Sequence, residues 1–140
     1  MTNIRWRLYS VGDKAQIEAI LKKMGETVPE EDIYDCSDVQ EAAEKAVSLV
    51  RKGKADFLMK GKLDTKVILK AVVNKETGLG QGRTMSHFAI MEVPNYHKMV
   101  AVVDGGMVPY PTLKQKKDII CNTVDTMRAM GYECPKVGVL

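Results

Sequence analysis

The residues with the clearest chemical potential lie between Lys60 and Thr65. An apolar run over residues 55–59 stops at Lys60-Gly61-Lys62, and a helical pattern begins at Asp64 or Thr65. This order predicts a strand, a tight turn and the N-terminus of a helix. Such a turn directs free backbone N–H groups and two ammonium groups toward one point, where the positive end of the helix dipole also lies. The segment therefore predicts a site for a phosphate group.

Two further loops carry polar residues. One runs from Gly78 to Thr84 and leads into Ser86 and His87, and the other is Asp104-Gly105-Gly106. In open α/β sheets, ligands bind beyond the carboxyl ends of strands. Arg83 suits a phosphate because a planar guanidinium donates two parallel hydrogen bonds. The candidate phosphate- and substrate-binding residues are Lys60, Lys62, Thr65, Arg83, Thr84, Ser86, His87 and Asp104.

Each of these loops also has a plain structural interpretation. Lys60 and Lys62 are equally consistent with solvated surface charges. The glycine-rich loop is consistent with a flexible connection, and it does not match a dinucleotide-binding fingerprint because it precedes a strand and not a helix. His87 is more typical of a core histidine with satisfied hydrogen bonds, Arg83 of a surface residue, and Asp104 of a turn cap. The sequence assigns no catalytic residue.

Alternating patterns place these loops between helices and strands. Asp13 is expected to cap the first helix, and Ser37 or Asp38 the second. Strands are expected at residues 5–11, 32–35, 55–59, 86–93 and 99–103. Helices are expected at residues 14–24, after the cap at Ser37 or Asp38, and at about residues 65–73 and 113–130, with glycines at 25, 53 and 131 ending the first, second and fourth of them.

This alternation predicts an α/β fold with three layers, in which helices cover both faces of a mostly parallel sheet. The two strands that flank Pro94 are consistent with an antiparallel pair. With 140 residues, the chain is most naturally one domain. Residues 137–140 resemble the start of a buried strand, although termini usually lie at the surface. We therefore expect a part of a larger α/β protein, or a chain that a partner completes.

Composition narrows the possible functions. The net charge is only +3, with 21 basic residues scattered among 18 acidic ones, which favours small anionic ligands and gives no support for nucleic-acid binding. Two histidines and three cysteines without CxxC spacing match no zinc site, and Cys121 falls in a helical pattern as a small hydrophobe. No secretory signal or membrane-length apolar run is present, so we expect a cytoplasmic protein that does not contact a membrane.

Several of these segments together resemble the phosphate acetyltransferase/phosphate butyryltransferase family, and the butyryl branch in particular. The resemblance runs in unbroken order from about Tyr9 to Leu140. The matching segments are Glu41-Ala42-Ala43-Glu44-Lys45-Ala46-Val47, Leu58-Met59-Lys60-Gly61-Lys62-Leu63-Asp64-Thr65, Asn74-Lys75-Glu76-Thr77-Gly78-Leu79, Gly82-Arg83-Thr84-Met85-Ser86-His87, Gln115-Lys116-Lys117-Asp118-Ile119-Ile120 and Pro135-Lys136-Val137-Gly138-Val139-Leu140.

The resemblance implies a reaction in which acyl-CoA and phosphate give acyl phosphate and CoA. It implies an isocitrate/isopropylmalate dehydrogenase-like fold of two α/β domains with the active site between them, of which residues 1–140 are a truncated part of the first. The expected partners are acyl-CoA and phosphate as substrates and a second copy of the chain, with no metal or redox cofactor. The chain departs from the family in lacking its first strand and helix, in stopping before the second domain, and in having Val108 where the butyryl branch often has Asn.

Two alternatives to an active enzyme stay open. One is a catalytically silent relative that binds a phosphate-bearing ligand such as CoA, or a partner chain. The other is a structural module that associates through an exposed sheet edge, because unpaired edge strands are templates for pairing.

Overall fold

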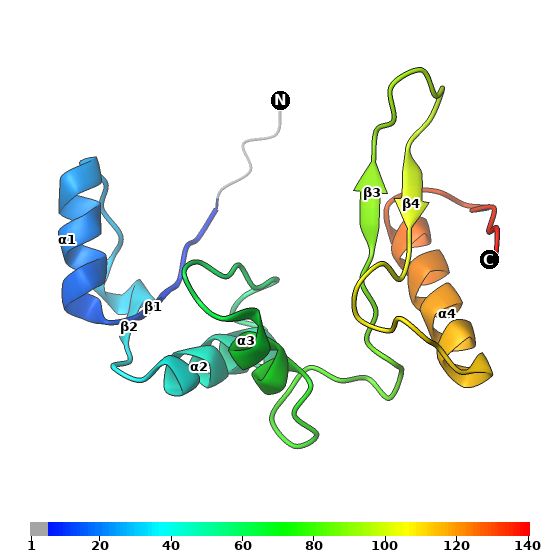
Figure 1. Cartoon of the computed structure of the whole chain (residues 1–140). Coiled ribbons are helices and arrows are strands. Elements are labelled where there is room, and N and C mark those ends of the chain that lie inside the picture. The colour runs from blue at the N-terminus through cyan, green and yellow to red at the C-terminus, as the bar shows by residue number, and fades with distance from the viewer. Residues whose placement is uncertain (1–5) are drawn as a thin grey trace. The chain divides into compact units, whose positions relative to one another are not determined.

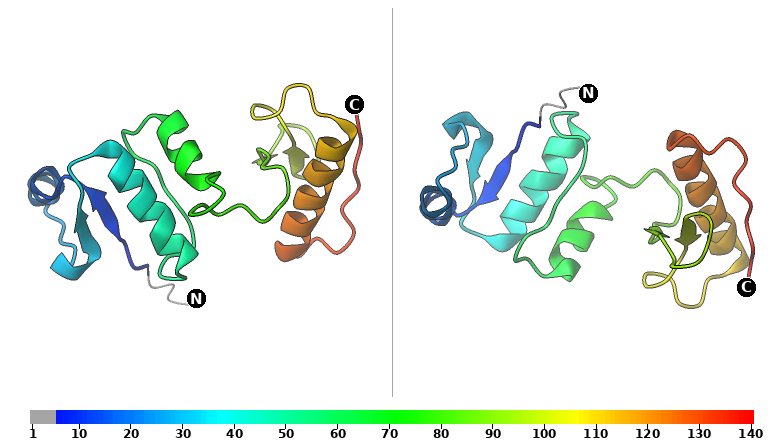
Figure 2. Two further views of the ribbon diagram at one scale, coloured as in Figure 1. Left: turned by 90° about the horizontal axis from the view of Figure 1, so that it is seen from below. Right: turned by 90° about the horizontal axis from the view of Figure 1, so that it is seen from above.

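The computed structural model describes residues 6–140, which form helices and short strands joined by long loops (Figures 1 and 2). The chain divides into two compact units, Met1–Gly80 and Gln81–Leu140. The structure is mixed α/β, as the sequence predicts. That residues 1–140 are part of one α/β domain stays a prediction.

The first unit begins with a parallel strand pair. Strand β1 (Ser10–Gly12) lies beside β2 (Ile33–Asp35), with Val11 opposite Tyr34 in the register. The connection contains helix α1 (Lys14–Met24) and a short 3-10 helix, η1 (Glu30–Asp32). Strand β2 lies within the expected range 32–35, whereas β1 overlaps the expected strand at 5–11 only at Ser10 and Val11 and extends one residue further, to Gly12. Arg5, the first residue of the expected strand at 5–11, lies outside the described residues.

Local signals set the ends of α1. The side chain of Asp13 accepts a hydrogen bond from the backbone N–H of Gln16 at 3.0 Å, which satisfies one of the free donors of the first turn. Gly25 ends the helix with a φ of 72°, a left-handed conformation that glycine adopts without a steric penalty. The predicted limits of this helix are therefore confirmed at both ends.

Helices α2 (Val39–Arg51) and α3 (Thr65–Val72) pack against each other and form the core of the first unit. Ala43, Val47 and Ala71 are buried where the two helices meet. The small alanine side chains allow the close approach, and Leu58 and Leu79 are among the flanking residues that cover the cluster. Asp38 caps α2 and Asp64 caps α3, each through its carboxylate.

Residues 55–59 do not form the strand that the sequence predicts. They have no regular structure, Phe57 and Met59 are exposed, and only Leu58 of the apolar run contacts the core cluster. A strand exists only where a second strand pairs with its backbone, and none of the described strands does so here. Phe57 instead meets the ring of Trp6 edge to face, with 6.4 Å between the ring centres.

The second unit is built from a hairpin and a long helix. Strand β3 (Ala89–Met91) pairs antiparallel with β4 (Val100–Val102), which confirms the predicted pair around Pro94. Helix α4 (Leu113–Ala129) follows (Figure 1). Thr112 and Gln115 form a reciprocal capping box at its start, and Gly131 follows its end with a φ of 93°.

The described strands form two separate two-stranded sheets, one parallel and one antiparallel. Residues 137–140 are exposed and without regular structure, so the expectation of a buried strand there is wrong for this chain. Within residues 6–140, no helix has both the length and the apolar character that crossing a bilayer requires.

Candidate functional site

The predicted lysine turn lies in the first unit, directly before α3. Thr65 is the first residue of that helix, and Asp64 caps it by accepting a hydrogen bond from the N–H of Lys66 at 2.8 Å. Lys60 is exposed, and its ammonium group donates to the backbone oxygen of Leu63 at 3.1 Å. Lys62 is also exposed. The helix N-terminus is therefore where the sequence places it, with a carboxylate already engaged there.

The glycine-rich loop is anchored over its first part. The side-chain oxygen of Asn74 accepts hydrogen bonds from the backbone N–H groups of Glu76 and Thr77, at 2.9 and 3.0 Å. The N–H of Gly78 then bonds to the backbone oxygen of Asn74, and that of Leu79 bonds to Val72 at the end of α3. Residues 74–79 are therefore held to α3, and the interpretation as a flexible connection does not describe them.

In the second unit, the segment that begins at Arg83 is bound to one face of α4. Both the backbone N–H and the hydroxyl of Thr84 donate to one oxygen of Asp118, at 3.0 and 2.9 Å. These two bonds hold the pKa of the Asp118 carboxyl below its usual range, although burial acts against them. Because both donors of Thr84 are used inside the chain, this residue anchors the loop.

One turn further along α4, Asn122 bridges two residues of the same loop. Its side-chain N–H₂ group donates to the backbone oxygen of Thr84 at 2.8 Å and to the hydroxyl oxygen of Ser86 at 3.2 Å. The orientation of this amide follows from chemistry, because a backbone carbonyl only accepts hydrogen bonds. Ser86 is therefore an acceptor toward Asn122.

Arg83 forms an ion pair with Asp125, at 2.6 Å between a guanidinium nitrogen and a carboxylate oxygen. The hydrogen bond to Asp125 raises the pKa of the Arg83 guanidinium. Both side chains are about half exposed, so the pair is open to solvent and a ligand anion can compete for the arginine.

Asp104 organises the turn after β4. One carboxylate oxygen accepts from the N–H groups of Gly106 and Met107, at 2.9 and 2.8 Å, and the other accepts from the N–H of His87 at 3.1 Å. Burial acts to raise the pKa of Asp104, but these backbone donors outweigh it and the pKa is lowered. The contacts are those of a turn cap. The side chain of His87 is exposed, so the interpretation as a core histidine is wrong.

The second unit thus gathers five of the eight candidates on a single framework, namely Arg83, Thr84, Ser86, His87 and Asp104. Lys60, Lys62 and Thr65 belong to the first unit. The convergence of all eight on one phosphate stays a prediction. Sequence reasoning did not select the residues of α4 that hold the loop. Their spacing, at positions 118, 122 and 125, puts them on one helical face, which was the available signal.

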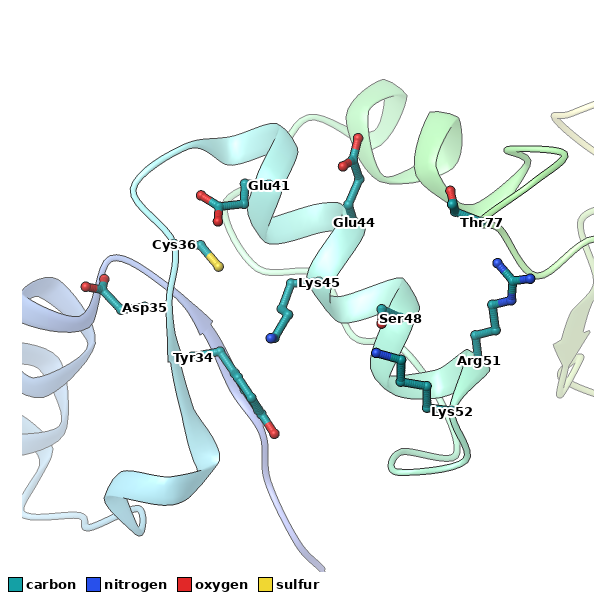
Figure 3. Close-up of a pocket in the computed structure, with 10 residues that line it drawn as sticks. All are labelled: Tyr34, Asp35, Cys36, Glu41, Glu44, Lys45, Ser48, Arg51, Lys52 and Thr77. Atoms are coloured by element: carbon teal, nitrogen blue, oxygen red, sulfur yellow. The ribbon is translucent and has the colours of Figure 1, made fainter.

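An open pocket of about 650 Å³ lies elsewhere, along α2 in the first unit (Figure 3). Lys45 extends toward Tyr34, with its ammonium nitrogen 4.7 Å from the ring centre. The pocket is lined by Tyr34, Asp35, Cys36, Glu41, Glu44, Lys45, Ser48, Arg51, Lys52 and Thr77. None of the eight candidates lines it. Among the described residues, no three His, Cys, Asp or Glu side chains gather where a metal ion could bind.

The elements and the loop framework define a mixed α/β protein with a polar, arginine-bearing loop fixed to a helix. Comparison with known proteins identifies the family. The pattern described as "Phosphate acetyl/butaryl transferase" matches residues 11–140, so the chain belongs to the phosphate acetyl/butyryl transferase family. This confirms the resemblance inferred from the sequence.

Individual relatives agree with this assignment. Phosphate butyryltransferase of Clostridium acetobutylicum is 43% identical over 127 residues, which cover 91% of this chain and 42% of that protein. Phosphate acetyltransferase of Thermotoga maritima is 40% identical over 126 residues, covering 88% and 42% respectively. A probable phosphate butyryltransferase of Bacillus subtilis is 33% identical over 135 residues, covering 96% and 44%. The chain thus spans less than half the length of these relatives.

Proposed function

We propose that this chain supplies part of a phosphate acyltransferase, which converts acyl-CoA and phosphate into acyl phosphate and CoA with a butyryl or branched short acyl group. The observation that carries the proposal is the 43% identity to a phosphate butyryltransferase over 91% of the chain. The proposal includes a cytoplasmic homo-oligomer, a three-layer isocitrate/isopropylmalate dehydrogenase-like fold for the complete protein, and no cofactor apart from CoA as substrate.

The chemistry defines what the site must do. Phosphate attacks the thioester carbonyl, or the CoA thiolate attacks the acyl phosphate in the reverse direction, and both directions pass through a tetrahedral oxyanion. The protein must hold two polyanions together, stabilise the oxyanion and manage the proton of the thiol. Cationic side chains and fixed hydrogen-bond donors meet the first two requirements.

The geometry of the second unit supports specific roles. Arg83 binds the phosphate, since its pair with Asp125 is solvent-exposed and exchangeable. Ser86 donates its hydroxyl proton to a phosphate or carbonyl oxygen. Asp104 orients the backbone of His87 through the 3.1 Å bond to its N–H. In the first unit, Lys60 and Lys62 offset negative charge, and Thr65 offers a hydroxyl at the start of α3.

The test uses the chain alone and a chimera. In the chimera, residues 11–140 replace the matching segment of the Clostridium acetobutylicum phosphate butyryltransferase. Thiol release from acetyl-, butyryl- and isobutyryl-CoA is measured with and without phosphate. We expect phosphate-dependent release by the chimera, fastest with a four-carbon acyl group, and strong loss of it with Arg83→Ala but not with Lys117→Ala, an exposed change on α4.

A folded chimera without turnover would overturn the proposal. Turnover by the 140-residue chain itself, in a fraction that elutes as an oligomer from gel filtration, would show that copies of the chain assemble a working site. Retained CoA or phosphate binding without any turnover in either protein would favour the alternative of a non-catalytic binding module.

A further inference from the structure

We infer that Asp118 and Asn122 are positioning residues, which fix the Arg83–Ser86 loop on α4 and leave the Ser86 hydroxyl proton free to be donated to a phosphate oxygen. The inference rests on the proposed function for the identity of the ligand. It goes beyond that function because neither residue contacts the ligand in this arrangement. Each acts through the loop.

Thr84 is held by two side chains of α4. Three of its polar atoms are bound by α4: the N–H and hydroxyl by Asp118, and the carbonyl oxygen by Asn122. Three hydrogen bonds from two side chains one helical turn apart therefore hold Thr84 and the peptide groups on both sides of it. Thr84 is half-buried, so water competes weakly for these bonds.

The hydroxyl of Ser86 acts as a hydrogen-bond acceptor toward α4. A serine hydroxyl has one proton to donate and two lone pairs to accept with. Asn122 donates to the Ser86 oxygen at 3.2 Å, which occupies one lone pair, and within residues 6–140 the Ser86 proton has no acceptor. The only proton that Ser86 owns on its side chain is therefore available to an anion. A carboxylate in place of Asn122 would take this proton for itself.

Two carboxylates of α4 lie against the loop. Asp118 and Asp125 are both acidic, yet each carboxylate is turned toward a donor of the loop, Thr84 in one case and Arg83 in the other. The negative charges are thereby partly offset on the α4 side of the loop. An incoming phosphate that binds the Arg83 nitrogen paired with Asp125 competes with that carboxylate, whereas the Asp118 and Asn122 contacts need not break.

The experiment uses the 140-residue chain labelled with ¹⁵N, with inorganic phosphate as the probe. Loop order is measured by heteronuclear relaxation of the Thr84 and Ser86 amides, and affinity by their shifts on titration with phosphate. We expect Asp118→Ala to mobilise the loop and to weaken phosphate binding about fivefold or more. Asp118→Asn, which keeps an acceptor for Thr84, should restore loop order and affinity to within about twofold.

A double-mutant cycle with Ser86 tests whether Asn122 acts as the hydrogen-bond donor to the Ser86 hydroxyl. We expect Asn122→Asp to weaken phosphate binding more than Asn122→Ala does, because the carboxylate captures the Ser86 proton. In the Ser86→Ala background, this difference between the two variants should shrink at least threefold. If it persists unchanged, simple charge repulsion explains it and the assigned polarity is wrong.

The two proposals fail in different ways. Loop order that is unchanged in Asp118→Ala and Asn122→Ala would overturn the positioning role, whatever the phosphate data show. A wild-type chain whose loop amides do not respond to phosphate, while loop order still depends on Asp118, would overturn the phosphate role of the loop and leave the positioning role supported. Lys117→Ala, on an exposed part of α4, serves as the matched control and should change neither readout.

Discussion

The guanidinium of Arg83 lies 2.6 Å from the carboxylate of Asp125, although 42 residues separate them in the chain. The pair is half exposed and joins the start of the loop to α4. Exposed ion pairs contribute little to stability, so the contact is better understood as one that holds the Arg83 side chain at α4, where under the proposed function a phosphate competes with the carboxylate.

A first prediction follows from this competition. Asp125→Asn should raise the affinity for inorganic phosphate by roughly twofold to fivefold, because an exposed ion pair of ordinary strength no longer opposes binding. Arg83→Ala should lower it by about tenfold to a hundredfold through loss of a charged hydrogen bond. Calorimetry at low ionic strength measures both. Equal affinities of wild type and Asp125→Asn would show that phosphate does not compete with Asp125, and an unchanged affinity in Arg83→Ala would show that Arg83 does not bind the phosphate.

The stability of the turn that Asp104 caps should depend on pH. Its carboxyl has a lowered pKa in the folded chain, so its contribution to stability is present above the unfolded value of about 3.9 and is lost as the pH falls through the folded value. The amide proton shifts of Gly106 and Met107 should report this change, with a midpoint below about 3.9. In Asp104→Asn the same amides should not titrate in that range. A midpoint clearly above 4 in the wild type would contradict the assignment.

Two glycines near the junction of the units offer a matched pair of substitutions. A Cβ atom at Gly78 would collide with the backbone oxygens of Val72 and Asn74, whereas one at Gly80 would meet nothing within 4 Å. Gly78→Ala should therefore destabilise the first unit by about 1–3 kcal/mol, the usual range for forced overpacking. Gly80→Ala should change stability little. Urea unfolding followed by circular dichroism measures both, and equal midpoints would show that the loop adjusts freely.

The cysteines should differ in reactivity. Burial is the main cause that raises the pKa of Cys36, with the charge of Glu41 adding to it, and only the thiolate reacts quickly. Cys134 is exposed and Cys121 is intermediate. Alkylation with iodoacetamide, followed by mass spectrometry, should modify Cys134 first and Cys36 last. The differences should vanish in denaturant, and early modification of Cys36 in the folded chain would contradict its burial.

Structural features that depend on only a few neighbouring residues could be predicted from the sequence. Asp13 and Gly25 bound a helix because a capping carboxylate and a left-handed glycine need nothing outside the helix itself. The antiparallel pair around Pro94 is of the same kind, because its strands are close in sequence. The lysine turn before α3 was located for the same reason.

Features that depend on distant partners could not be predicted in this way. The apolar run at residues 55–59 has the composition of a strand, but pairing decides whether a strand forms, and composition does not reveal a partner. The contact between Thr84 and Asp118 joins residues 34 positions apart. Sequence reasoning chose Thr84 as a ligand contact because of its type, whereas the structure uses its donors to fasten the loop.

The edge-to-face contact of Trp6 with Phe57 has a practical consequence. Trp6 is the single tryptophan of the chain, and both rings belong to the same unit. Intrinsic indole fluorescence therefore reports melting of the unit Met1–Gly80. In a Trp6→Phe background, Phe88→Trp at a half-buried position would place the single indole in the other unit, whose melting would then be followed separately. Comparison of its melting curve with that of the wild type would show whether the two units melt at the same temperature.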